Sequence, residues 1–181
     1  PRMASSPPTH LATVHRLQGH VTLARAHFEE ALSIGEASGD HQGLVPPLAG
    51  LAMVLAESDP EEALRLAGRA GSLASLARPK ALIAATEAAV RTGDLTLAAS
   101  RAEEAGAAAR DHRDRPALAE ALELRAKVTA DPVAAGRILD EAATIWLETG
   151  SPLGRARVLL ARARLGGPDA GPLAAKAEQA L

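Results

Sequence analysis

The sequence of 181 residues has no cysteine and no tyrosine, and it has only one phenylalanine and one tryptophan. The absence of cysteine excludes disulfides, thiolate nucleophiles and cysteine-based zinc sites. The scarcity of aromatic side chains disfavours β-sheets, in which aromatic and β-branched residues are enriched. Long apolar runs are missing as well, and none approaches the ~18 residues that a membrane-spanning helix needs.

A strong charge of one sign is also missing, because 20 lysines and arginines face 22 aspartates and glutamates, for a net charge of −2. Proteins that bind nucleic acid usually carry a basic patch, so we expect no direct nucleic-acid binding and no membrane association. No signal-peptide pattern is visible, and the sequence begins at a proline, as an excised fragment would. We therefore expect a cytoplasmic protein.

Alanine and leucine supply most of the 47% of residues that are hydrophobic. Alanine is the strongest helix former. A core made of such small side chains closes only where helices approach one another closely. The composition therefore predicts an all-α protein.

One apolar pattern recurs along the chain. In its first copy, "GHVTLARAHFEEAL", the residues Ala24, Phe28 and Ala31 follow Gly19 at spacings that place them on one face of a helix. The pattern returns at intervals that vary little, and a period of about 35–39 residues indicates an array of supersecondary units. The later copies are Ala63, Ala67 and Ala70; Ala98, Ala102 and Ala105; Ala135, Leu139 and Ala142; and, more weakly, Leu173, Ala177 and Ala180.

Turn residues divide each unit into two helices. Asp59-Pro60 and Asp131-Pro132 predict a helix N-cap followed by proline at the first helical position, and Gly93-Asp94 predicts the same start without proline. A second set of breakers is expected shortly before the first helix of later units: Pro46-Pro47, Pro79, Pro116 and Pro152. The pattern therefore predicts helix pairs and not long single helices.

The segment "LATVHRLQGHVTLARAHFEEAL" at residues 11–32 resembles the tetratricopeptide repeat, with His15 in the family's tyrosine position. The resemblance covers residues 8–181 and implies an all-α superhelix, or solenoid, of about five antiparallel helix pairs. Residues 1–7 are expected to be disordered or linker-like. The expected repeats are residues 8–40, 41–77, 78–112, 113–149 and 150–181.

The same resemblance implies that the first helices of the pairs line a concave groove that binds a partner. The groove is mixed apolar and charged, and it lacks a lysine and asparagine array for clamping a peptide carboxylate. An amphipathic helix or an extended segment would fit it better. The main candidate residues are Arg16, Met53, Glu87, Arg91, Glu120, Lys127 and Arg162, and the same frame adds Thr9, Ala49, Ala56, Ile83 and Val158 among others.

Candidate catalytic and metal sites are weak. His10, His15, His20 and His27 gather near the start, but their spacing does not place them on one helix face, so we expect solvent-exposed or packing histidines. The pairs of adjacent glutamates are expected to lie on solvated helix faces or in first helical turns. We therefore expect no metal, no cofactor and no enzymatic activity.

The period is longer than the family's usual period of about 34 residues. This longer form, rich in alanine and arginine, resembles the C-terminal repeats of large actinobacterial regulators of the LuxR-type, maltose-activator-like and antibiotic-regulatory groups. The resemblance implies an interaction or effector-sensing module of a larger bacterial transcriptional regulator, which would bind a protein segment or a small effector. The alternative is a stand-alone scaffold or adaptor. An exposed apolar end of the array is expected to allow homodimers.

Overall fold

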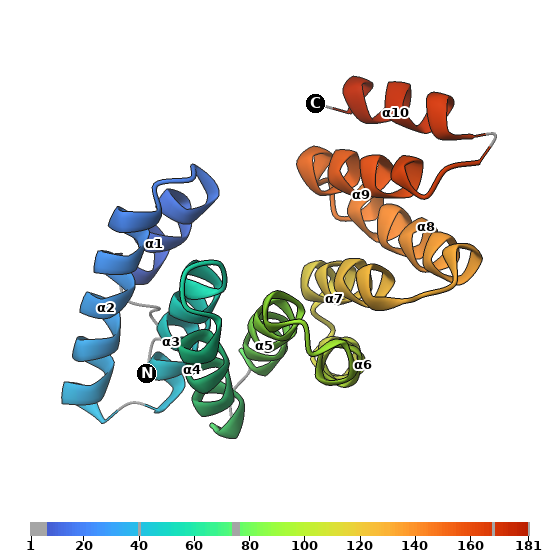
Figure 1. The fold of residues 1–181 in the computed structure, drawn as a ribbon. Coiled ribbons are helices and arrows are strands. Elements are labelled where there is room, and N and C mark those ends of the chain that lie inside the picture. Colours follow the sequence, from blue (N-terminus) through green and yellow to red (C-terminus); the bar gives the residue numbers. More distant parts are fainter. Residues whose placement is uncertain (1–6, 40, 74–76, 168, 181) are drawn as a thin grey trace. The chain divides into compact units, whose positions relative to one another are not determined.

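The computed structural model describes residues 7–39, 41–73, 77–167 and 169–180, which form ten helices and no strand (Figure 1). Residues 1–6 of the expected linker lie outside this range, and Pro7 begins the first helix. The helices are α1 (Pro7–Leu17), α2 (Val21–Ser38), α3 (His41–Leu55), α4 (Pro60–Ser72), α5 (Arg78–Thr92), α6 (Leu95–Asp111), α7 (Arg115–Val128), α8 (Pro132–Glu148), α9 (Pro152–Arg164) and α10 (Ala170–Gln179).

Successive helices pack against each other from α1 to α5 and from α7 to α10. The protein thus has an all-α fold of the tetratricopeptide-like helical-repeat type, which confirms the predicted fold class. The chain divides into two compact units, residues 1–101 and 102–181, with the boundary inside α6. Unit 1 contains α1 to α5 and the start of α6, and unit 2 contains the rest.

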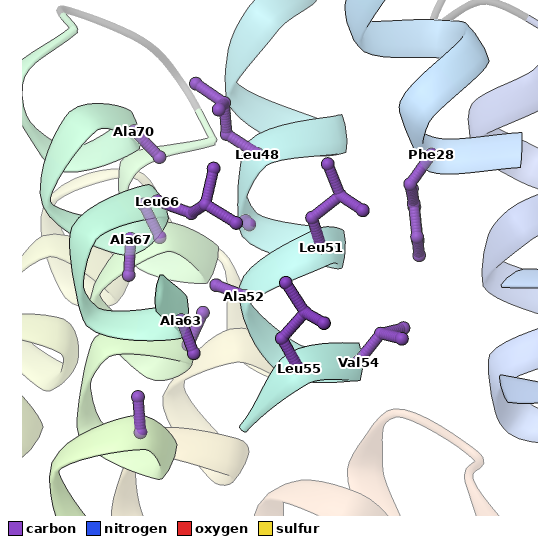
Figure 2. Close-up of a cluster of buried hydrophobic side chains, with 14 of the residues drawn as sticks. Phe28, Leu48, Leu51, Ala52, Val54, Leu55, Ala63, Leu66, Ala67 and Ala70 are labelled. Atoms are coloured by element: carbon purple, nitrogen blue, oxygen red, sulfur yellow. The ribbon is translucent and has the colours of Figure 1, made fainter. Parts of the chain in front are cut away.

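The core of unit 1 surrounds α3, which packs on α1, α2, α4 and α5. Phe28 of α2 lies on the side of α3 that carries Leu51 and Val54, and α4 covers another side (Figure 2). Alanines such as Ala24 and Ala52 are fully buried between these larger side chains. Small residues at the contacts let helix axes come near the short end of the usual ~8–10 Å separation.

The recurring apolar positions face the interior, as the sequence pattern predicts. In the first four copies every one of them is at most 4% exposed, including Ala24, Ala98 and Ala135. In the weaker fifth copy Ala177 is buried, while Leu173 and Ala180 are half-buried. The period of the pattern therefore reports the packing of the helices directly.

The helix starts are confirmed where an aspartate was expected to cap them. The Asp59 carboxylate accepts a hydrogen bond from the Glu62 N–H, and Asp94 and Asp131 accept equivalent bonds at the starts of α6 and α8. Pro79, Pro116 and Pro152 were expected shortly before their helices, and the structure places them one or two residues further on, in the first turns of those helices.

Pro46 and Pro47 do not precede their helix, so that prediction is wrong: both lie inside α3, which begins at His41. A proline inside a helix removes a backbone hydrogen bond. Here Pro47 is fully buried, and the apolar surface that its ring removes from water offsets part of that cost.

Unit 2 is a run of hairpin contacts in which α7 packs on α8, α8 on α9 and α9 on α10. Trp146 of α8 is buried against the backbone of Gly154 in α9, so it closes the contact between the fourth and fifth helix pairs. Its indole N–H donates to the Glu123 carboxylate of α7 at 2.8 Å.

Candidate partner-binding surface

In unit 1 the first helices of successive pairs lie side by side, because α3 contacts both α1 and α5. From Leu44 to Glu57, only Pro46, Met53 and Glu57 are not buried. The spacing of seven positions places Pro46 and Met53 on one narrow strip of the α3 surface, and Glu57 continues the strip in the turn that follows the helix. The strip is therefore what α3 presents to solvent.

The α5 helix presents a matching strip. Lys80, Glu87 and Arg91 have the same spacings of seven and four positions, and they are also not buried. The Arg91 guanidinium donates to the Glu57 carboxylate at 2.6 Å, which joins the two strips at one end. We call Met53, Glu57, Lys80, Glu87 and Arg91 the odd-helix surface.

This surface combines a flexible apolar side chain with charges of both signs. Met53 also packs against the buried core cluster of unit 1, and this contact holds its side chain in position. The side chains of Arg91 and Glu57 are 48% and 74% exposed. Exposed ion pairs contribute only ~0–1 kcal/mol, so a partner's charged group can replace either member at little cost.

The structure divides the predicted groove residues between the two units. Arg16 lies half-buried on α1, and Met53, Glu87 and Arg91 lie on the odd-helix surface. In unit 2, Glu120 is half-buried and Lys127 is exposed on α7. Arg162 of α9 pairs with Asp140 at 3.4 Å and packs across Gly136 of α8, so its side chain is already held by the preceding helix.

Several other residues that the sequence assigned to the groove are not at the surface, and their assignment to the groove is wrong. They are buried because adjacent helices cover these positions, which the repeat frame had placed toward solvent. Pro46, Glu57 and Lys80 were missed, although the spacing of seven and four positions, repeated on both helices, marks them in the sequence. The buried residues are Thr9, Ala49, Ala56, Ile83 and Val158.

Three histidine rings come together at the turn between α1 and α2. The His15 ring stacks on His27 with centroids 5.5 Å apart and lies 5.7 Å from His20. The spacing along the chain did not predict this contact. Within the described ranges, no group of three or more histidine or acidic side chains has a geometry that could hold a metal ion.

A small hollow of about 210 Å³ lies in unit 2 between α6 and α7. It is lined by small and apolar residues and by Glu103, Arg110 and Arg125. The hollow is smaller than the ~300–1,000 Å³ of typical small-molecule sites. It therefore gives no support to binding of a small effector.

Residues 4–74, which include α1 to α4, match the family model described as "Tetratricopeptide repeat". Together with the helical architecture, this match supports a tetratricopeptide array. Repeats of this family generally mediate protein–protein interactions and generally have no enzymatic activity. No curated protein matches the sequence. Among the described residues, no helix has both the length and the apolar character required to cross a membrane.

Proposed function

We propose that this protein is a non-enzymatic interaction module that binds a segment of a protein partner on the odd-helix surface of unit 1. The observation that carries the proposal is the repetition of one strip of residues that are not buried, at equivalent places of α3 with its following turn and of α5, two helices whose other residues are mostly buried. The family match supports an interaction role and not a catalytic one.

The chemistry of the surface indicates the kind of segment. Met53 has a flexible, polarizable side chain that adapts to an apolar anchor of the partner. Lys80 and Arg91 can pair with acidic groups, and Glu57 and Glu87 with basic groups. An amphipathic helix or an extended segment with one large apolar side chain between charged residues fits this arrangement.

The wider setting that we propose is a sensing module of a larger bacterial transcriptional regulator in the cytoplasm. The long period between the final alanines of successive copies supports this setting through resemblance. The alternative is a stand-alone scaffold or adaptor. In either setting we expect that this chain does not hydrolyse ATP and does not change the electrophoretic mobility of DNA. A positive result in either assay would contradict the proposal.

The test is selection of binding peptides from a displayed library with the full chain, followed by calorimetric titration of a selected peptide. Lys80→Glu and Arg91→Glu change exposed residues, so the fold should persist, which circular dichroism checks. We expect each charge reversal to weaken binding about tenfold, which corresponds to ~1.4 kcal/mol, because it removes an attraction and adds a repulsion.

The matched control is Arg69→Glu. Arg69 of α4 pairs with Glu36 of α2 at 2.7 Å, and the two side chains are 41% and 48% exposed, so this is also an exposed ion pair, here between second helices. We expect this variant to bind the peptide as the wild type does. A peptide that is lost with Arg69→Glu and retained with Arg91→Glu would place the binding surface elsewhere.

A further inference from the structure

The hollow between α6 and α7 lies where the recurring apolar pattern loses its large side chains. All the residues that line it belong to unit 2. Two of them, Ala102 and Gly106, occupy the places in the third copy of the pattern that Phe28 and Leu32 occupy in the first copy. A methyl group and a hydrogen atom therefore stand where the first copy carries an aromatic ring and a leucine side chain.

The first copy shows what kind of side chain fills this place. The ring of Phe28 lies against the backbone of Gly50 in the first helix of the next pair, and Leu32 packs on the same buried cluster. Figure 2 shows the Phe28 ring beside α3. The fourth copy holds Leu139 at the place of Phe28, and the second copy holds Ala67. Two of the four clear copies therefore carry a large apolar side chain where the third copy has a hollow of about 210 Å³.

The charged residues around the hollow form only loose ion pairs. Arg110 lies 3.7 Å from Glu141, and Arg125 lies 3.8 Å from Glu103. Both distances exceed the ~2.7–3.2 Å of a hydrogen bond, and both arginine side chains are exposed. Two arginines and one glutamate line the hollow, so its lining is net positive. A carboxylate of a partner would form the short, charge-assisted hydrogen bonds that these pairs lack.

We propose that the hollow binds one aromatic side chain of a protein partner, and that an acidic residue of the same segment pairs with Arg110 or Arg125. The Phe28 ring of the first copy argues for the aromatic group, and the net positive lining argues for the acidic one. A single side chain suits a hollow that is too small for a typical small-molecule ligand. Aromatic side chains in such pockets are frequent anchors of protein interfaces. The hollow lies in unit 2, so this proposal does not depend on the odd-helix surface.

The probe for this site is phenylpropionate, which joins one phenyl ring to one carboxylate. It is titrated into the full, isotope-labelled chain and followed by NMR. We expect saturable shifts of the backbone amides of Gly106, Ala121 and Leu122, which line the hollow. Propionate lacks the ring and phenylpropanol lacks the charge, so each should bind more weakly. The absence of saturable shifts around the hollow, or shifts only at other residues, would overturn the proposal.

Gly106→Leu tests the location, because it places in the hollow the leucine that the first copy has there. A Cβ atom on Gly106 would have its nearest neighbours at 3.6 Å and 4.0 Å, in the side chains of Arg110 and Leu118, so the new side chain has room. Phenylpropionate should no longer bind. Gly68→Leu is the matched control, since Gly68 is a glycine inside α4 with no atom within 4 Å of such a Cβ atom. Binding that persists in Gly106→Leu, or that is lost equally in the control, would contradict the proposal.

Arg110→Gln and Arg125→Gln test the acidic contact by changing only exposed side chains, so they do not depend on repacking of the hollow. At least one of them should weaken the binding of phenylpropionate about threefold, as expected for one exposed ion pair. Neither should change the binding of phenylpropanol, which carries no charge. Unchanged binding of phenylpropionate in both variants would contradict the acidic contact. A peptide selected for the odd-helix surface should still bind Gly106→Leu, so the two proposals can fail separately.

Discussion

The ring of Phe28 lies directly against the backbone of Gly50. A Cβ atom placed on Gly50 would be 2.3 Å from both Cε1 and Cζ of that ring, far inside van der Waals contact. Phe28 belongs to α2 and Gly50 to α3, so this contact fixes how closely the first two hairpins approach. The chain's only phenylalanine is thus matched to a residue without a side chain.

Gly50→Ala should destabilise unit 1. In an open helix, alanine in place of glycine stabilises by ~1 kcal/mol. At this site the added methyl group meets a buried aromatic ring, and overpacking of this kind costs roughly 1–3 kcal/mol. We expect the free energy of unfolding to fall, as measured by urea denaturation followed by circular dichroism.

Gly68→Ala is the control for that prediction. Gly68 is an exposed residue inside α4, and a Cβ atom placed on it would have no neighbouring atom within 4 Å. We expect a gain of about 0.5–1 kcal/mol, because alanine loses less backbone entropy on folding. If both variants shift stability in the same direction, the contact between Phe28 and Gly50 does not restrain the fold as described.

Trp146→Phe should destabilise unit 2 through a lost hydrogen bond. The Trp146 indole donates to Glu123, whose side chain is 15% exposed and which also accepts two hydrogen bonds from Arg157. Hydrogen bonds to charged groups contribute about 1.5–3 kcal/mol, and we expect the lower end because Arg157 remains. Urea denaturation followed by circular dichroism measures the loss.

The partner experiment places Trp146→Phe in a Glu123→Gln background. If the indole bond to the carboxylate is responsible, the cost of the tryptophan change should be smaller there, which gives a coupling energy for the pair. An unchanged cost would attribute the effect to ring size alone, since Trp146 also packs on Gly154.

The sequence was sufficient to predict which face is buried on the second helix of nearly every helix pair. Ala24, Ala98 and Ala135 recur because a close contact between helices admits only small residues, and a recurring contact leaves a recurring spacing. The capping aspartates were predictable for a similar reason, because their hydrogen bonds are local. Asp59 and Asp131 each bond to an N–H within three residues.

The candidate surface was predicted less well, because exposure depends on neighbours far along the chain. Ala49 and Ile83 were expected to face solvent but are 2% exposed. Met53, on the same helix as Ala49, is half-buried. The stack of His15 on His27 likewise arises from the hairpin geometry, since the two rings belong to different helices and no helical spacing relates them.

Arg113→Gly should stabilise the protein. Arg113 lies in the turn that follows α6 and has a φ of 55°, the left-handed conformation that Gly19, Gly93 and Gly150 adopt after comparable helix ends. That conformation costs a residue with a side chain ~1–2 kcal/mol, and glycine avoids this cost. Glycine also gives the unfolded chain more conformational entropy, which cancels part of the gain in stability. We expect a net gain of up to ~1 kcal/mol, measured by thermal and urea unfolding.

Arg113→Ala separates the backbone from the charge, because it removes the guanidinium and keeps the Cβ atom. We expect this variant to be close to the wild type in stability. A gain as large with alanine as with glycine would show that the arginine side chain, and not its φ angle, is the source of the cost.

The stability contributed by Glu62 should depend on pH. Its carboxylate accepts two hydrogen bonds from Arg65, at 2.6 and 2.5 Å, and this pairing holds the pKa of Glu62 below its usual range. A carboxyl group whose pKa is lower in the folded state contributes stability above its unfolded pKa and loses it as the pH falls through the folded value. Glu62→Gln should therefore be less stable than the wild type near neutral pH, and the difference should shrink in acid.

The cause of this dependence can be assigned by titrating Glu62 by NMR in the wild type and in Arg65→Gln. Because the hydrogen bond from Arg65 is the largest influence on Glu62, its pKa should rise toward the usual value when Arg65 is replaced. Both side chains are on the surface of α4, so high salt should weaken only the part of the effect that comes from charge. If the Glu62 pKa stays low in Arg65→Gln, the start of the helix and its dipole would hold the carboxylate ionised in place of Arg65.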